Sequence, residues 1–225
     1  MKLGVLGGTF DPIHLGHLQL AHRTQKHFAL AQVHFVVTAV PPHKSAEELI
    51  PFNHRYAMVS LATSGATVFV PSLIELDPPA SPYSIHTLRK QASRYRKGQA
   101  NIYFIAGGDS LLEVGGWRES GELLSSYNFV FVVRPGFDVS NAGAILPRGA
   151  IARVRDFRGL GPRQLRRNIQ TEEKTFEKRI FIIDVGALDI SSTQIRSLVA
   201  AGTRIHHLVP PPVYEYIQKL RLYGD

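Results

Sequence analysis

The chain has no cysteine, which excludes disulfide bonds, thiolate metal sites and a cysteine nucleophile. Long apolar runs are missing as well, because no segment approaches the roughly 20 apolar residues that cross a bilayer. The apolar start, residues 1–8, is too short for a secretory signal. The sequence therefore predicts a protein of the reducing cytoplasm without a membrane anchor.

Acidic residues are outnumbered by basic ones, 18 to 26, so the formal net charge is +8. Most of this excess lies between Arg148 and Arg179, where ten basic and four acidic residues carry a net charge of +6. A basic surface suits either nucleic acid or small anionic substrates. Aromatic residues that stack on bases are sparse in that segment, which contains only Phe157 and Phe176. Nucleic-acid binding is therefore the weaker alternative.

Strand-like and helix-like patterns alternate along the chain. Apolar and β-branched runs predict strands at residues 2–6, 33–40, 66–70, 101–106, 128–133 and 179–185. Helical spacing predicts helices at residues 15–28, 54–63, 84–95, 191–200 and 213–222. The residues expected to cap three of these helices are Asn53, Ser84 and Ser191.

This alternation predicts an α/β fold, a doubly wound, Rossmann-like parallel sheet with helices on both faces. We expect a single domain that spans residues 1–225. Steady periodicity is missing from residues 138–178, which we interpret as a basic insertion or mobile loop within that domain.

The strand-to-helix junction at residues 7–17 carries the strongest functional signal, the string Gly7-Gly8-Thr9-Phe10-Asp11-Pro12-Ile13-His14-Leu15-Gly16-His17. Doubly wound sheets bind ligands at the carboxyl ends of strands, and a glycine turn before a helix lets backbone N–H groups converge on an anion. His14 and His17 are three residues apart, so both imidazoles can face one side of the helix start and donate to phosphate oxygens. A histidine pair also occurs in metal sites, but no third ligand stands at helical spacing beside it, and no protein metal site is predicted.

The whole string resembles the signature of the nucleotidylyltransferase superfamily, whose members carry a glycine, aromatic and proline pattern ending in His-x-Gly-His. Further segments resemble the nicotinate mononucleotide adenylyltransferase family and span nearly the full chain: Pro41-Pro42-His43-Lys44, Ser81-Pro82-Tyr83-Ser84 with Thr87-Leu88, Ile105-Ala106-Gly107-Gly108-Asp109-Ser110, Trp117, Arg134-Pro135-Gly136, and Ile190-Ser191-Ser192-Thr193-x-Ile195-Arg196. The resemblance implies an enzyme that joins ATP and nicotinate mononucleotide into nicotinate adenine dinucleotide, with release of pyrophosphate, in NAD biosynthesis.

By this resemblance, residues at several strand ends bind ATP. The segment from Ser191 to Thr193 opens a helix whose free N–H groups suit the β- and γ-phosphates, with Arg196 one turn further on. Asp109 can accept from ribose hydroxyls, and Arg134 is expected to flank adenine. Taken alone, each of these residues also fits a capping, turn or surface role. The expected ATP site is Gly7, Gly8, Thr9, Phe10, His14, His17, Gly107, Asp109, Arg134, Ser191, Ser192, Thr193 and Arg196.

The acceptor site is expected at the same edge of the sheet, beside the ATP site. The family uses a tryptophan at the position of Trp117 to form the nicotinate pocket, together with backbone amides near Tyr83 and Ser84, where members often carry threonine in place of Ser84. Lys44 follows two stiffening prolines and is expected to contact a phosphate. The acceptor set is thus Lys44, Tyr83, Ser84 and Trp117, and the catalytic set is His14, His17, Lys44 and Arg196.

The expected chemistry needs positioning more than proton transfer, because an acceptor phosphate is already an oxyanion near neutral pH. Mg²⁺ is expected to be coordinated by the ATP phosphates and water. Alternatives are an adenylyltransferase for nicotinamide mononucleotide or phosphopantetheine, and a non-catalytic nucleic-acid-binding module. The oligomeric state is left open, with a homo-oligomer among the alternatives.

Overall fold

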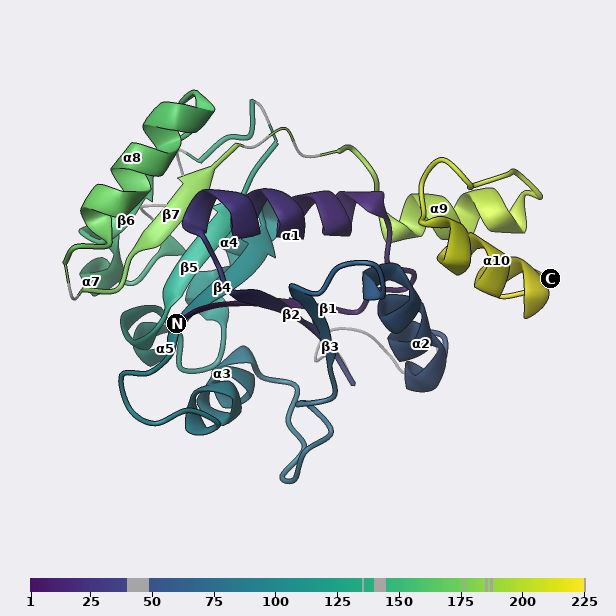
Figure 1. Ribbon diagram of the computed structural model, residues 1–225, viewed down its shortest axis with the longest axis horizontal. Coiled ribbons are helices and arrows are strands. Elements are labelled where there is room, and N and C mark those ends of the chain that lie inside the picture. The colour runs from purple at the N-terminus through teal and green to yellow at the C-terminus, as the bar shows by residue number, and fades with distance from the viewer. Residues whose placement is uncertain are drawn as a thin grey trace.

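The protein was studied as a computed structural model, which describes residues 1–39, 49–134, 136–139, 145–175, 177–184, 186 and 188–224. Its strands are β1 (Lys2–Gly8), β2 (Gln32–Val37), β3 (Phe69–Ser72), β4 (Asn101–Gly107), β5 (Asn128–Val132), β6 (Val154–Asp156) and β7 (Ile180–Ile183). They form one sheet in the order β3-β2-β1-β4-β5-β7-β6, with every pair of neighbours parallel (Figure 1). The predicted doubly wound, Rossmann-like sheet is confirmed.

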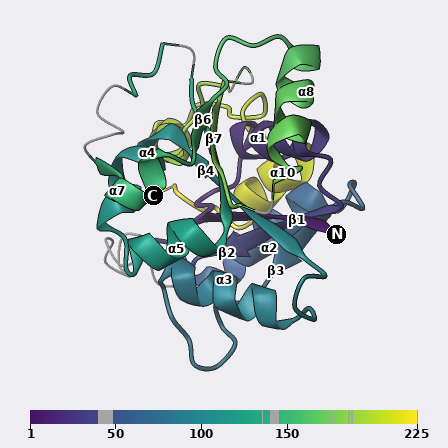
Figure 2. The ribbon, with the colours of Figure 1, turned by 90° about the vertical axis from the view of Figure 1, so that its left-hand side faces the viewer.

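Helices cover both faces of this sheet. They are α1 (Leu15–Phe28), α2 (Phe52–Thr63), α3 (Ser84–Ser93), α4 (Gly108–Glu113), α5 (Ser120–Ser126), α7 (Arg148–Ile151), α8 (Pro162–Glu172), α9 (Ser192–Ala200) and α10 (Pro211–Lys219), with a 3-10 turn, η2 (Val114–Gly116). In Figure 2, α1, α8 and α10 lie on one side of the sheet, and α4, α5 and α7 lie on the other. Among the residues described, no helix combines the length and apolar character needed to cross a membrane.

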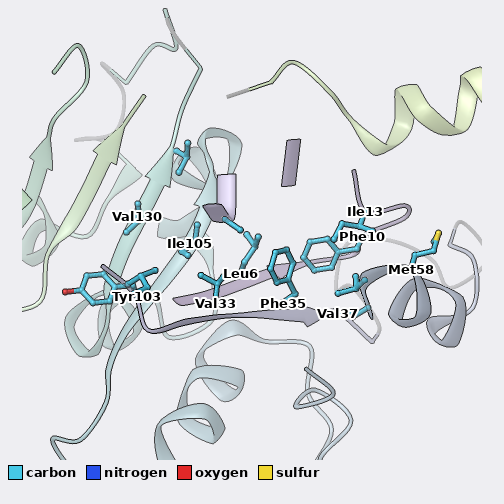
Figure 3. Packing of buried hydrophobic residues seen from close by; sticks show 14 of the residues in the cluster. Leu6, Phe10, Ile13, Val33, Phe35, Val37, Met58, Tyr103, Ile105 and Val130 are labelled. Atoms are coloured by element: carbon cyan, nitrogen blue, oxygen red, sulfur yellow. The ribbon is translucent and has the colours of Figure 1, made fainter. Parts of the chain in front are cut away.

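Two buried cores follow from the alternation of side chains along each strand. In β4, Tyr103 and Ile105 belong to the first core, whereas Phe104 and Ala106 belong to the second. The first core is shared with α1, α2, α8, α9 and α10, and the second with α3, α4, α5 and α7. Figure 3 shows part of the first core, a row that runs from Tyr103 past Leu6 and Phe35 to Met58 in α2. The two faces of the sheet thus carry separate sets of helices.

Helix starts were predicted with mixed success. Ser191 caps α9 as expected, because its side chain accepts from the Gln194 N–H at 3.1 Å. The expectation that Asn53 caps α2 was wrong, since α2 begins at Phe52 and Pro51 occupies the cap position. Ser84 is likewise the first residue inside α3, after Tyr83 at the cap. In both cases extended backbone just before the helix sets its start without a capping side chain.

The segment expected to be irregular contributes regular structure. Between residues 145 and 175 lie α7, β6 and α8, none of which the sequence predicted. Strand β6 pairs with β7 at the edge of the sheet, with Val154 opposite Ile180. Helix α8 buries Leu165 and Ile169 in the first core. The apolar stripe of α8 is narrow and arginines surround it, so its helical periodicity was easy to miss. The division of the chain into one domain with an insertion stays a prediction.

Candidate functional site

A cavity of about 740 Å³ opens at the carboxyl ends of the central strands. Gly7 and Gly8 line it from the end of β1, and Ala106 and Gly107 line it from the end of β4. Between these two strands the strand order reverses, because β2 and β3 extend the sheet beyond β1 while β5 and later strands extend it beyond β4. This switch point is where doubly wound sheets bind ligands, and the volume lies within the roughly 300–1,000 Å³ of ligand pockets.

The two motif histidines cap α1 reciprocally. His14 is the N-cap residue, and its Nδ1 accepts from the His17 N–H at 3.4 Å. The Nδ1 of His17 in turn accepts from the His14 N–H at 3.3 Å. The rings stack with their centroids 3.7 Å apart, and a Cβ on Gly16 would lie only 2.9 Å from the His14 Nδ1. The start of α1 therefore sets the orientation of both imidazoles, and Gly16 provides the space.

Both imidazoles are uncharged near pH 7. Burial lowers the pKa of His14 to about 4, and burial together with the neighbouring His14 lowers the pKa of His17 below its ordinary value. A neutral imidazole that accepts at Nδ1 carries its proton on Nε2. Since both residues line the cavity, each can offer an uncharged Nε2–H donor to an occupant.

Helix α9 meets the histidine motif from the far end of the chain. Ser191 and Ser192 line the cavity, and the Ser192 hydroxyl donates to the Pro12 carbonyl oxygen at 2.9 Å. The first N–H groups of any α-helix lack intrahelical acceptors, so this helix start can receive an anion. We call His14, His17, Ser191 and Ser192 the histidine wall of the cavity.

Not all predicted ATP contacts face the cavity. Arg196 lies beside it and donates to the Asp11 carbonyl oxygen at 2.8 Å and to the Thr193 Oγ1 at 3.3 Å. Thr193 is also outside the lining, and the Phe10 side chain is buried in the first core, 5.0 Å from the His17 ring by centroids. For these residues the predicted contact stays a prediction.

The remaining predicted ATP residues do line the cavity. Thr9 adjoins the glycines of β1, and Asp109 is the second residue of α4, two positions after Gly107. Arg134 follows β5, and its guanidinium forms an ion pair with Asp189, which precedes α9. The structure thus brings together β1, β4, β5 and the approach to α9 around one space.

The second face of the sheet contributes the other wall. Trp117, Tyr83 and Ser84 line the cavity, and Trp117 packs edge-on against Phe104 at 5.9 Å between ring centroids. Arg118 also lines the cavity, with its guanidinium 5.0 Å above the Tyr83 ring. We call Tyr83, Ser84, Trp117 and Arg118 the tryptophan wall. Lys44, the remaining predicted acceptor and catalytic residue, lies outside the described residues.

A glycine shapes the approach to the tryptophan wall. A Cβ on Gly115 would lie 1.9 Å from the Ile145 carbonyl oxygen, so no other residue fits at this position without movement of the backbone. Gly115 in η2 thus lies close to the backbone of Ile145, which belongs to the segment predicted as an insertion.

Sequence reasoning missed Arg55, a buried cation that hydrogen-bonds to the backbone of two cavity-lining residues. It is 2% exposed, and its Nη1 donates to the carbonyl oxygens of Thr9 at 2.9 Å and Thr38 at 2.7 Å. Burial lowers its pKa, while the nearby Asp11, Tyr223 and Glu75 raise it. An arginine within a helix usually indicates a surface position, so the local pattern held no signal for this role.

Glu75 was missed as well. It lines the cavity while being 6% exposed, and it accepts from the Ala39 N–H at 3.0 Å and the Thr87 hydroxyl at 3.4 Å. Burial raises the pKa of its carboxyl group, and the two hydrogen bonds oppose that rise. A signal existed, because an acid within the short apolar run at residues 73–76 is unusual unless it is held by partners. Within the described ranges, no group of three or more histidine, aspartate or glutamate side chains could hold a metal ion.

Comparisons with known proteins agree with this geometry. The chain matches the cytidylyltransferase-like family over residues 5–198. A protein of Pelobacter propionicus named a probable nicotinate-nucleotide adenylyltransferase is 39% identical over 228 positions, covering 100% of this chain and 99% of the relative. A protein of Geobacter metallireducens with the same name is 40% identical and covers 99% and 98% of the two chains.

Solved structures share the fold. The nicotinic acid mononucleotide adenylyltransferase of Plasmodium falciparum complexed with NaAD has a TM-score of 0.70 and 18% identity, covering 99% of this chain and 97% of that one. The same protein complexed with APC has a TM-score of 0.68 and 17% identity, covering 99% and 96%. Because curated relatives near 40% identity align along its whole length, the chain belongs to the nicotinate-nucleotide adenylyltransferase family.

Proposed function

We propose that this protein transfers the adenylyl group of ATP to the phosphate of nicotinate mononucleotide and releases pyrophosphate, a step of NAD biosynthesis. The observation that carries the proposal is the cavity at the switch point, where the histidine wall faces the tryptophan wall across the ends of β1 and β4. One wall offers donors for phosphates, and the other offers aromatic rings and a cation. This combination suits two nucleotides bound side by side.

The reaction then proceeds by direct displacement. An oxygen of the acceptor phosphate bonds to the α-phosphorus of ATP, the bond from that phosphorus to the bridging oxygen breaks, and pyrophosphate leaves with the electron pair. Negative charge grows on the α-phosphate oxygens and on the leaving group. Nε2–H donors of His14 and His17 stabilise that charge without moving, because the cap of α1 already holds both rings.

Uncharged donors have a specific advantage here. An imidazolium would bind the triphosphate tightly in the ground state, whereas a neutral donor gains most when charge develops. We assign the β- and γ-phosphates to the start of α9 and to Arg196, and a further phosphate contact to Lys44. ATP is used as its magnesium complex, with the metal on phosphate oxygens and water and without a ligand from the chain.

Selection of the acceptor falls to the tryptophan wall. Trp117 and Tyr83 present ring faces and edges for a pyridine ring, and Arg118 adds a positive charge beside them. A guanidinium favours a carboxylate over a neutral amide. We therefore propose that Arg118 contributes to preference for nicotinate over nicotinamide mononucleotide. The absence of cysteine suits a reducing cytoplasm, where we propose that the reaction takes place.

Pyrophosphate release with three acceptors tests this proposal. Purified protein is supplied with ATP, Mg²⁺ and either nicotinate mononucleotide, nicotinamide mononucleotide or phosphopantetheine. We expect the largest kcat/KM with nicotinate mononucleotide and a dinucleotide product of matching mass. A higher kcat/KM with either of the other acceptors would assign the protein to that substrate instead.

A further inference from the structure

The turn after α10 reaches back to the histidine motif. The Tyr223 hydroxyl donates to Asp11 Oδ1 at 2.6 Å, although the two residues are 212 positions apart. Asp11 is 1% exposed. Tyr223 has a φ of 64°, in the left-handed region that costs energy for a residue with a side chain. In this unfavourable turn Tyr223 both packs against the first core and donates to Asp11.

The Asp11 carboxylate has a second neighbour, Arg196, with which it forms a long ion pair but no hydrogen bond. Among the described residues, its Oδ2 is buried without a hydrogen-bond partner. The Nη1 of Arg196 lies 3.9 Å from that oxygen, but donates to the Asp11 carbonyl oxygen instead. A buried carboxylate is costly when it is left without partners. If the bond from Tyr223 were lost, the nearest compensation would be a close ion pair with Arg196.

We propose that Tyr223 is a positioning residue: it keeps the Asp11 carboxylate from forming a close ion pair with Arg196. The guanidinium, which already donates to the Asp11 carbonyl oxygen and to Thr193 Oγ1, then keeps its other N–H groups for the triphosphate of ATP. The inference rests on the role of Arg196 given under the proposed function. Burial and the adjacent Asp11 raise the pKa of Tyr223, so its hydroxyl remains a proton donor at neutral pH. A backbone contact joins the same two regions, because the Leu15 N–H donates to the Leu208 carbonyl oxygen at 2.9 Å. Residues 208 and 223 thus contact the β1–α1 junction at Leu15 and at Asp11.

Tyr216 supplies a matched control in α10. Its hydroxyl is hydrogen-bonded to His54 Nδ1 at 2.9 Å, which ties α10 to α2. Neither Tyr216 nor His54 lines the cavity. Removing this hydroxyl therefore tests the general effect of loosening α10.

The experiment compares the wild type, Tyr223→Phe and Tyr216→Phe by steady-state kinetics and by calorimetric titration with ATP. We expect Tyr223→Phe to raise both the KM and the Kd for ATP about tenfold, the scale of a charge-assisted hydrogen bond. The kcat should change less and the KM for the acceptor should not change, while Tyr216→Phe stays near the wild type. Adding Asp11→Asn to Tyr223→Phe removes the charge that captures Arg196, so ATP affinity should return to within about threefold of the wild type.

Three results would overturn the proposal. One is an unchanged ATP affinity in Tyr223→Phe, and another is a loss of kcat and melting temperature that Asp11→Asn does not restore, which indicates packing alone. If Tyr223→Phe does not fold, the single variant Asp11→Asn is compared with the double variant that carries both changes. A lower ATP affinity in the double variant than in Asp11→Asn is the third result that would overturn the proposal. A wild type that releases no pyrophosphate would count against the proposed function only, because the Kd for ATP still reports on Tyr223.

Discussion

The two walls of the cavity are held in different ways. In the histidine wall, side chains hydrogen-bond to backbone groups, as in the reciprocal cap of His14 and His17 and the bond from Ser192 to Pro12. In the tryptophan wall, Trp117 and Arg118 make ring contacts at 5.9 and 5.0 Å, and the exposed Arg118 also forms an ion pair with Glu119 at 3.7 Å. Hydrogen bonds to a helix start fix direction, whereas ring contacts tolerate small shifts. Changes in the first wall should therefore affect turnover, and changes in the second should affect which acceptor is chosen.

The largest effect is expected from His17→Ala. Loss of one donor aimed at the developing charge should lower kcat by about 10²–10³, with a much smaller change in the Kd for ATP. Steady-state kinetics and calorimetry measure the two quantities. His22→Ala is the control, since His22 lies on the exposed side of the same helix. Equal losses of kcat and ATP affinity would mean that His17 acts in ground-state binding.

The next effect is a dependence of stability on pH. The pKa of His14 is about 4 in the folded protein and 6.5 when unfolded, so the unfolded state binds more protons between these values. The free energy of unfolding should rise with pH across this window and level off above it. His14 alone should contribute roughly 3 kcal/mol to the rise.

Urea denaturation from pH 4.5 to 7.5 measures this rise. His17, His27 and His34 also have a lowered pKa and add to the slope. The variant His14→Gln should flatten the slope relative to the wild type by about the share of one histidine. The same slope in His14→Gln and in the wild type would show that His14 is not held neutral.

A smaller effect is expected from Gly16→Ala. The added Cβ would meet the His14 ring and displace it, which should lower kcat by roughly tenfold and destabilise the fold by about 1–2 kcal/mol. Gly121→Ala in α5 is the matched control, because a Cβ there meets nothing within 4 Å. If Gly16→Ala keeps its activity while its stability falls, the orientation of the His14 ring is not important for catalysis.

The smallest effect is expected from Arg118→Ala. Loss of its charge should reduce the ratio of kcat/KM for nicotinate over nicotinamide mononucleotide by about fivefold, with little change in kcat. Arg96→Ala, at an exposed position outside the cavity lining, is the control. An unchanged ratio of kcat/KM in Arg118→Ala would mean that backbone amides and the aromatic rings, and not Arg118, distinguish the two acceptors.

The sequence predicted what depends on local patterns. Strand runs, helical spacing and the Ser191 cap are readable within a few residues, and a parallel sheet then brings the strand ends together. The glycine and histidine motif could be placed at the switch point for the same reason.

Contacts between distant segments could not be predicted in this way. Arg55 looks like a surface arginine until the fold buries it against Thr9, 46 positions away. Tyr223 and Asp11 meet only because α10 packs on the first core beside the motif. Helix α8 was missed because only two of its residues, Leu165 and Ile169, are buried, and arginines are among the residues around them. The contacts of Arg55 and Tyr223 depend on tertiary packing that leaves no local trace in the sequence, whereas Glu75 and α8 left only weak local signals.

A crystal structure with a non-hydrolysable ATP analogue bound would show where the triphosphate lies relative to the two histidines. We expect an α-phosphate oxygen within hydrogen-bond distance of the Nε2 atoms of His14 and His17, and the outer phosphates at the start of α9. A triphosphate bound away from β1, with both imidazoles turned from it, would mean that these histidines do not stabilise the reacting phosphate.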